Sequence, residues 1–539
     1  MLTYVRRALN RLWGAWVSVQ VEYHGSYSEE RLQRLSKYTE SLTTWRLLLV
    51  CAITPFPCVV LSLLKEIPPL APAEDGVYKN GVFFIRAWVV MLFMGVSGLL
   101  QMGHGAPRLK LTTQQITLVS LLAATCSILV IFSLSVLTVF PLPFGLLIAG
   151  PPFVLVIAVC FTSISRPQWQ DDPSIFVDVQ RQLVVYNCQT TLPFIYPLYI
   201  LGFVSLTGWN QVVFVAVLPV IQIIAKNWIS RALADDNDQK PQCVIFVVEV
   251  YNALYVSSVL QAAQSWMSTA AIMIVDILQF WVSMSDIVKL LDDVNALMAK
   301  IPRNHPIAKE NFVQVAVRLM IIEQPAENQK NVQDSSAGVP ANDKVLTTQQ
   351  ASYVPQQRKT WVPKWIISRK AHVSPRFLSE QHSCPNLTLE SIFSQEDRVQ
   401  FIKKSSHVLY ITEYLVLVEY VEVAMPIVYC LHQLILFHMH NGAYYPTLSE
   451  VSSDVFTSRM LSTLLYSLFQ FGSFILLVVV LKRKLGYSSL EQLAFVLDGH
   501  AGPVQTKLNL IFVYIMQVGL IHHGADFTFQ FAWLHSDGK

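Results

Sequence analysis

The sequence predicts an all-α fold: a polytopic integral membrane helical bundle of about eleven transmembrane helices, with ten as the rival count. Only 14% of the 539 residues are charged, whereas a soluble globular chain carries about 25%. Apolar residues make up 53% of the chain, and its mean hydropathy is +0.43. A soluble protein of this size could not cover its surface with so few charges. Disorder requires low hydrophobicity, and the net charge of +3 is too small for a nucleic-acid-binding surface.

The apolar residues gather in eleven runs, most of them near the 20 or so residues that cross the hydrocarbon core. These runs lie near 45–64, 82–102, 116–140, 142–164, 191–207, 211–229, 244–261, 265–284, 408–437, 459–481 and 508–534. The third and fourth are joined only by the turn at 141–143, and the fifth is short. The eleventh contains His522, His523 and Asp526, so a short helix followed by a re-entrant piece is the alternative there.

The distribution of Lys and Arg orients these spans, because cytoplasmic loops carry an excess of both. With the N-terminus in the cytosol, 34 of the 39 Lys and Arg residues fall on the inner side. The five on the outer side are Lys65, Lys79, Arg86, Arg459 and Lys539. Discounting the 16 residues in the long loop 285–407 still leaves 18 against 5. We therefore predict a cytosolic N-terminus. Eleven spans put the C-terminus outside and ten put it inside, and the choice between plasma membrane and endomembrane stays open.

The spans and loops divide the chain into four parts. They are a cytosolic amphipathic N-terminal segment at 1–44, about eight spans at 45–284, a cytosolic loop at 285–407 and about three spans at 408–539. Within the first part, Arg6, Arg7 and Arg11 lie opposite apolar residues at 3–4 spacing. This pattern is typical of a helix that lies on anionic lipid, or against the cytosolic face of the protein itself.

The loop 285–407 changes character along its length. Apolar residues at 3–4 spacing from Ile287 to Leu297 predict a helix. The stretch 324–358 is rich in Gln, Asn, Ser, Ala and Pro, which predicts a disordered linker. Residues 358–377 mix Lys and Arg with Trp, which favours contact with anionic lipid. The bilayer and anionic lipid are thus the expected partners; the protein partners of the loop are unknown, and no nucleic acid is expected.

Catalytic and cofactor-binding motifs are missing from the sequence. It contains no Walker A loop, G-x-G-x-x-G, H-E-x-x-H or G-x-S-x-G pattern. Its eight cysteines form no C-x-x-C pair, and scattered cysteines in apolar runs are typical of small hydrophobic core residues. We therefore predict no enzymatic activity and no cofactor.

Carboxylates are the main candidate functional groups, because ionisable residues are costly inside a membrane. The first six spans contain no Asp or Glu. The last five contain Glu249, Asp276, Glu413, Glu419, Glu422 and Asp526. Few cations accompany them, since Arg86 and Lys226 lie near span ends, where they can snorkel to the interface. Glu413 lies near a span end as well, where it can cap or reach the headgroups.

Glu419 and Glu422 form the central pair. Their i, i+3 spacing puts them on one helix face close to mid-span, which suits a proton relay or a cation site. Pro426 has no N–H to donate to the carbonyl of Glu422, so that oxygen is a further ligand candidate. The structural alternative is that each carboxylate is hydrogen-bonded by a neighbouring Tyr, Ser or Asn.

Histidines make a weaker cluster. His522 and His523 lie one turn from Asp526, and His432, His438 and His440 lie toward the outer end of the ninth span. His and Asp on one helix face can bind a transition metal, but such residues are more often hydrogen-bonded at an interface. We predict no metal site and keep His522, His523, Asp526 and His438 as weak candidates.

Several stretches carry a resemblance to a known group of proteins. They are 412–446 (TEYLVLVEYVEVAMPIVYCLHQLILFHMHNGAYYP), 481–497 (LKRKLGYSSLEQLAFVL), 524–533 (GADFTFQFAW) and 247–284. With these stretches the chain resembles a large, functionally uncharacterised family of multi-pass membrane proteins found in oomycetes. The resemblance implies a membrane protein and carries over no activity or site residue.

The function predicted from these features is secondary transport, or a channel, for a cation or a proton-coupled solute. Glu419 and Glu422 would form the central ion or proton site, with Asp276 and Glu249 nearby. The alternative is a non-transporting receptor or scaffold that acts through the loop 285–407. A membrane enzyme that uses His522, His523 or His432 ranks last. Transport predicts acidic helices around a wet cavity, whereas a scaffold predicts a dry bundle in which each carboxylate is capped.

Overall fold

The computed structural model describes residues 18–233, 236–262, 266–302, 305–323, 389–449 and 451–526, and all regular structure in them is helical. The first α-helices are α2 Glu29–Ser41, α3 Thr44–Ile53, α4 Phe56–Leu64, α5 Gly81–Gly105, α6 Thr113–Leu137, α7 Gly145–Asp171, α8 Pro173–Ser205, α9 Trp209–Phe214 and α10 Val217–Ala232. The others are α11 Lys240–Ala262, α12 Trp266–Met298, α14 Leu389–Ile392, α15 Gln395–Phe437, α16 Pro446–Ser449, α17 Ser453–Leu485, α18 Ser489–Gly499 and α19 Ala501–Val518. The 3₁₀ turns are η1 Val21–Tyr23, η2 Ala73–Asp75, η3 Pro306–Lys309, η4 His440–Tyr444 and η5 Ile521–His523.

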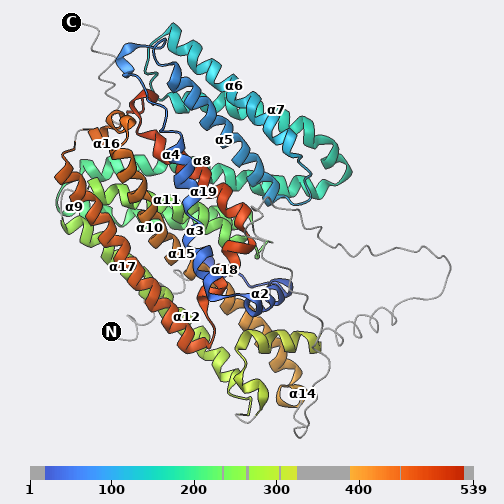
Figure 1. Cartoon of the computed structure of the whole chain (residues 1–539). Coiled ribbons are helices and arrows are strands. Elements are labelled where there is room, and N and C mark those ends of the chain that lie inside the picture. The colour runs from blue at the N-terminus through green and yellow to red at the C-terminus, as the bar shows by residue number, and fades with distance from the viewer. Residues whose placement is uncertain are drawn as a thin grey trace, which may run out of the picture.

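Helices α11 and α15 form the centre of the bundle (Figure 1). In their most apolar 18-residue windows, 94% of α11 and 72% of α15 are buried, against 17% of α7. A helix that is apolar on every side is stable only where every side is covered. Helix α11 packs along α15 and α10, while α12 and α17 pack against α15 and against each other. The carboxylates on α11, α12 and α15 therefore belong to neighbouring helices.

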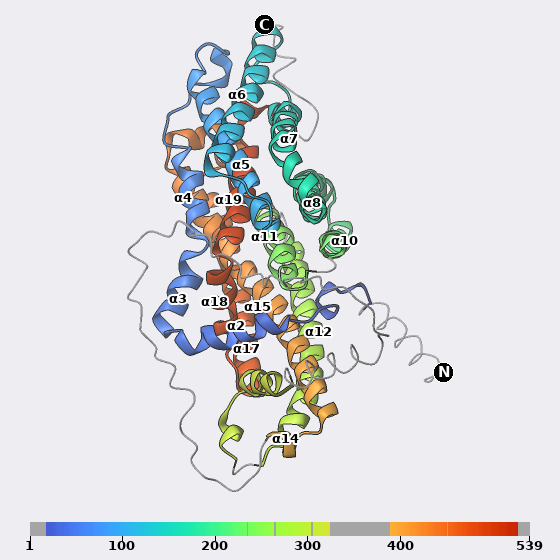
Figure 2. The ribbon, with the colours of Figure 1, turned by 90° about the vertical axis from the view of Figure 1, so that its right-hand side faces the viewer.

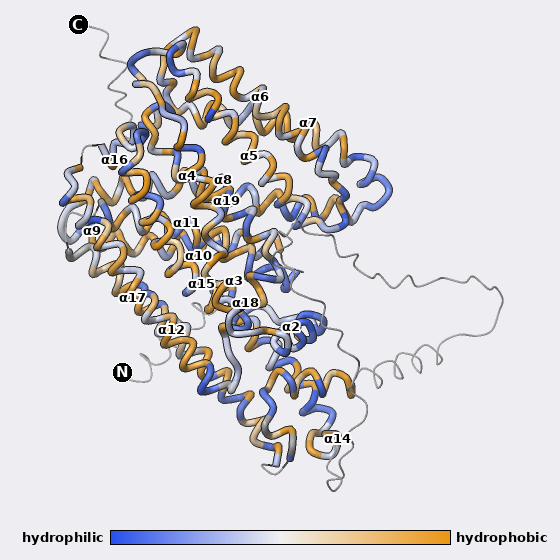
Figure 3. Tube along the Cα trace, in the orientation of Figure 1, coloured by the Kyte–Doolittle hydropathy of each residue, from blue (hydrophilic) through white to orange (hydrophobic). Residues whose placement is uncertain are grey.

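Helices α5, α6 and α7 lie side by side as a layer beside this centre (Figure 1). Hydrophobic residues run along much of α5, α6, α12 and α17, as the orange stretches of the tube in Figure 3 show. Leu118 and Leu129 of α6 are 64% and 58% exposed. Large contiguous apolar faces are unusual on a soluble monomer, and hydrocarbon would cover them. The all-helical architecture is thus compatible with an integral membrane protein, as predicted.

The predicted spans match the helices only in part. Nine helices in the described ranges are long and apolar enough to cross a membrane, against the eleven runs predicted. The predicted span 191–207 is the second half of α8, where Pro193, Pro197 and several Tyr and Thr residues lower the hydropathy. The predicted span 508–534 overlaps α19, which ends at Val518 and is followed by a turn rather than a continuing helix.

The long helices also extend beyond the predicted limits. Helix α15 has 43 residues, or about 65 Å at 1.5 Å per residue, whereas the hydrocarbon core is about 30 Å thick. It begins after the N-cap Ser394, inside the predicted loop 285–407. Helix α12 continues to Met298, which confirms the helix predicted from the spacing of Ile287 to Leu297. Most of the predicted N-terminal helix, the linker 324–358, and the patch 358–377 lie outside the described residues.

Helices α2, α3 and α18 pack together near one end of the bundle (Figure 2). We call this the α2 end; the predicted topology places it in the cytosol. Helix α18 reaches it through a tight turn after α17. Gly486 ends α17 with a left-handed φ of +63°, and its N–H donates to the carbonyl of Lys482. This conformation favours glycine over all other residues.

The turn at Gly486 generates a stability prediction. Gly486→Ala should lower the free energy of unfolding by about 1 kcal/mol, because a Cβ is strained in the left-handed region. The matched control is Gly472→Ala in the exposed middle of α17, where an added Cβ meets nothing within 4 Å. That change should be neutral or stabilising, because alanine favours helix. Melting temperatures of both variants in detergent check this, and equal shifts of the two would contradict it.

Candidate functional site

All four carboxylates predicted as an ion or proton site line one cavity. It lies between η1, α10, α11, α12 and α15. The centres of water molecules can occupy about 80 Å³ of this cavity. A single water needs about 10–15 Å³ measured in the same way. The cavity therefore has room for several waters. Its charged lining residues are Glu22, Lys226, Glu249, Asp276, Glu419 and Glu422.

Helix α15 supplies the central pair. Glu419 and Glu422 face the cavity from successive positions on one side of the helix, next to Leu415 and Val418. Glu419 is 3% exposed, and its Oε2 is buried without a hydrogen-bond partner among the described residues. A buried carboxylate oxygen with no donor is costly. Glu22 Oε2, in the same cavity wall, is likewise buried without a partner among the described residues.

Glu249 of α11 has a partner that the sequence did not predict. The Nζ of Lys226 on α10 lies 2.6 Å from Glu249 Oε1. The expectation that Lys226 snorkels to the interface is therefore wrong. Its side chain turns inward and is 15% exposed, while that of Glu249 is 1% exposed. The attraction to an otherwise unpaired buried carboxylate outweighs the hydration that an interfacial ammonium would gain.

Asp276 of α12 is capped from α17. The hydroxyl of Tyr466 donates to Asp276 Oδ2 at 2.7 Å, and Gln470 Nε2 donates to the same oxygen at 3.2 Å. Gln470 also donates to the Tyr466 hydroxyl at 2.8 Å. This is the arrangement expected of a structurally satisfied carboxylate. The cavity thus contains one carboxylate paired with a cation and one capped by neutral donors, while Glu22 and Glu419 each have a buried oxygen without a hydrogen-bond partner among the described residues.

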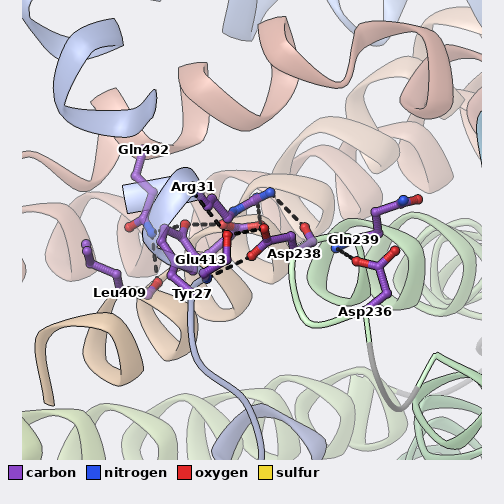
Figure 4. Close-up of polar contacts among 9 residues, drawn as sticks. Tyr27, Arg31, Asp236, Asp238, Gln239, Leu409, Glu413 and Gln492 are labelled. Atoms are coloured by element: carbon purple, nitrogen blue, oxygen red, sulfur yellow. Dashed lines mark hydrogen bonds and ion pairs between the residues drawn. The ribbon is translucent and has the colours of Figure 1, made fainter. Parts of the chain in front are cut away.

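Glu413 lies in a second cluster, where the N-terminal segment packs against α15 (Figure 4). Arg31 Nη2 donates to both carboxylate oxygens of Glu413, at 2.7 and 2.8 Å, and the hydroxyl of Tyr27 donates to Oε2. Glu413 is fully buried and Arg31 is 3% exposed. The expectation that Glu413 caps a helix or reaches the headgroups is therefore wrong, because Arg31 from the N-terminal segment neutralises it.

This cluster ties the N-terminal segment to several elements. Arg31 Nη1 donates to the carbonyl of Asp238, before α11, and Gln492 of α18 donates to the Tyr27 hydroxyl at 2.6 Å. Burial, followed by the charge of Glu413, raises the pKa of Tyr27 well above its ordinary value, so the phenol stays a neutral donor. Burial opposes the charge of Arg31, but Glu413 and Tyr27 raise the pKa of its guanidinium.

The anchored segment has a consequence for the cavity. Its preceding residues Gln20, Glu22 and Tyr23 form part of the cavity wall. The amide of Asn227 on α10 donates to the carbonyl of Val19 at 2.8 Å, which fixes the same stretch from the other side. The carboxylate cavity is thus bounded by the N-terminal segment at the α2 end.

Arg86 also pairs with a buried carboxylate. Its Nη2 lies 2.6 Å from Glu66 Oε1, and Lys65 Nζ lies 3.3 Å from the same oxygen. The hydroxyl of Tyr445 donates to this oxygen at 2.7 Å. Arg86 is 5% exposed, so the expectation that it snorkels is wrong too. The neighbouring charges of Lys65 and Glu66 are the feature of the sequence that could have indicated this cluster.

The weak metal candidates do not assemble. No group of three or more His, Cys, Asp or Glu in the described ranges could hold a metal ion. His522 hydrogen-bonds the carbonyl of Ala71 and stacks on Phe83, and His523 packs edge-on to the same ring. His438 is exposed and hydrogen-bonds its own helix at Leu434. His432 is buried and contacts Ser62.

The Arg31–Glu413 pair generates the second prediction. Glu413→Gln should lower the free energy of unfolding by about 3–5 kcal/mol, because it leaves the buried charge of Arg31 without its partner. The matched control is Glu30→Gln, which breaks the exposed pair of Glu30 with Arg34 on the same helix. That pair should contribute at most about 1 kcal/mol. Chemical unfolding in mixed detergent measures both variants, and equal stabilities would refute the structural role of Glu413.

The comparisons with known proteins do not test the resemblance to oomycete membrane proteins, which stays a prediction. It carries no activity or site residue to this cavity, whose description comes from the geometry alone. No family model, no curated protein and no solved structure matches the chain.

Proposed function

We propose that the protein is a secondary transporter or channel for a cation or a proton-coupled solute. The observation that carries this proposal is the charge of the cavity. Five carboxylates and a single lysine line it. Even if Lys226 neutralises Glu249, four acidic groups share a space of a few water diameters. Ionised carboxylates that close repel one another strongly in a low-dielectric environment, so bound cations or protons must balance them.

The cavity distinguishes transport from a scaffold role. A scaffold needs its buried carboxylates capped for packing alone, as Tyr466 and Gln470 cap Asp276. No donor among the described residues reaches Glu419 Oε2, and Glu419 and Glu422 face a space large enough for water. Evolution toward stability alone would replace such groups with apolar ones, since a carboxylate without a partner is destabilising. Unpaired carboxylates at a wet cavity favour a site for a mobile cation.

The backbone adds to this donor set. Pro426 cannot donate a hydrogen bond to the carbonyl of Glu422, one turn earlier in α15. A free carbonyl oxygen inside a membrane is tolerated where it faces protein or a water-filled cavity. Two carboxylates and this carbonyl lie within a single turn of one helix. They supply the hard oxygen ligands that small cations prefer.

The proposal is tested by ligand-dependent stability. The purified protein is melted from about pH 5 to 8 with a panel of alkali-metal, divalent and ammonium salts at constant ionic strength. A cation that binds only the folded state raises the melting temperature by mass action. We expect at least one cation to do so, and Glu419→Gln/Glu422→Gln to lose the shift while remaining folded.

The control and the transport assay complete this test. Glu74→Gln, at an exposed position in η2, removes an acidic group outside the cavity and should keep the wild-type shift. In proteoliposomes, the cation that raises the melting temperature should be carried by wild type and not by the double Gln variant. Flux in the double variant equal to that of wild type would exclude a transport role for these carboxylates.

A further inference from the structure

The cavity contains one bound ammonium group, and that group belongs to the protein. We propose that the transported cation is a small primary alkylammonium, recognised in the way that the cavity already holds Lys226. This inference rests on the proposed function and names its substrate class. Lys226 is an alkylammonium joined to α10, and its Nζ lies 2.6 Å from a carboxylate that is 1% exposed. The cavity therefore accommodates the –CH₂–NH₃⁺ group in one conformation of the chain.

The wall suits a cation that has a hydrocarbon part. Besides its carboxylates, it contains the rings of Tyr23, Phe280 and Tyr414 and the aliphatic side chains of Ile223 and Ile411. Dedicated sites for inorganic cations are built from oxygen ligands on all sides, whereas sites for organic ligands are largely apolar with a few polar groups. Aromatic faces also attract organic ammonium ions. A wall that combines apolar, aromatic and acidic side chains matches an amphiphilic cation.

One carboxylate binds the ammonium group of Lys226, and others remain available to a free ammonium ion. Glu249 is paired with Lys226, and Asp276 is capped by Tyr466 and Gln470. Glu419 and Glu422 face the same space, and no donor among the described residues reaches the buried Oε2 of Glu419. A primary ammonium has three N–H donors, which two neighbouring carboxylates and the Glu422 carbonyl can accept. The free ligand would thus bind at Glu419 and Glu422 of α15.

The first experiment compares cations on wild-type protein. Melting temperatures are measured with methyl-, ethyl-, n-propyl- and n-butylammonium chloride, tetramethylammonium chloride, NaCl and KCl at equal ionic strength. We expect primary alkylammonium ions to bind at least tenfold tighter than K⁺, with affinity rising with chain length until the cavity is full. Tetramethylammonium, which has no N–H, should bind more weakly than n-propylammonium. Glu419→Gln/Glu422→Gln should abolish the alkylammonium effect.

The second experiment uses Lys226 itself. Lys226→Ala removes three methylenes' worth of chain with the ammonium and leaves Glu249 unpaired, so its melting temperature should fall. Added n-propylammonium, which has the size of the deleted fragment, should restore most of the loss, and tetramethylammonium should not. The control is Lys79→Ala, which removes an ammonium from an exposed pair with Asp75 and should gain nothing beyond the wild-type response.

Each outcome decides between the two proposals. If Na⁺ or K⁺ stabilises wild type as strongly as n-propylammonium does, the proposed function stands and the alkylammonium inference is overturned. If alkylammonium ions stabilise only Lys226→Ala, they merely replace the missing side chain, and the inference is again overturned. If no cation of the panel stabilises wild type at any pH, transport of a cation bound at these carboxylates fails, and the alkylammonium inference fails with it. Should Lys226→Ala not fold, Lys226→Met with the wild-type cation series still separates these outcomes.

Discussion

The structure is organised by the cost of burying carboxylates in the middle of a helical bundle. Each such group requires a cation, a donor or water, because an isolated ionised carboxylate is strongly disfavoured in a low-dielectric interior. Helix α15 carries two of them, Glu413 and Glu419, and the half-buried Glu422 as well. Elements remote in sequence meet at these residues: the N-terminal segment brings Arg31 to Glu413, while α10 and α12 help to enclose the cavity at Glu419 and Glu422. The packing around α15 is thus tied to its charges as well as to its apolar surface.

The position of the N-terminal segment follows from the same requirement. Arg31 satisfies Glu413 only if α2 lies against α15 at this residue, and this places Glu22 and Tyr23, several residues earlier, in the cavity wall. The carbonyl of Ser406 accepts from the amide of Tyr27 at 3.2 Å, and His407 contacts the carbonyl of Gly25 at 2.7 Å. A structural ion pair and the boundary of the cavity are therefore mechanically connected. A movement of α2 would alter the cavity.

The sequence predicted what depends on local pattern and missed what depends on long-range pairing. Hydropathy gave the helical class and most of the long helices, and the i, i+3 spacing placed Glu419 and Glu422 on one face. Hydropathy predicted too many spans where Pro, Tyr and Thr interrupt an apolar run, as in α8. The partners of Glu249, Glu413 and Glu66 could not be predicted, because residues such as Lys226 and Arg31 are assigned by linear position to interfaces. Only the folded arrangement brings each cation inward.

Comparison of the buried charge clusters within this one chain separates structural charges from candidate functional ones. At Glu413, one carboxylate meets one guanidinium and a phenol. At Glu66, one carboxylate meets two cations and a phenol. Neither residue lines the cavity. In the cavity the ratio is reversed, with five carboxylates and one lysine around a space that admits water. The same chain neutralises its other buried carboxylates with its own side chains, so the excess at the cavity is a property of that site. Among the described residues, Lys226 is the single cation in the cavity wall, and the proposed function assigns the balancing positive charge to a cation or proton from solution.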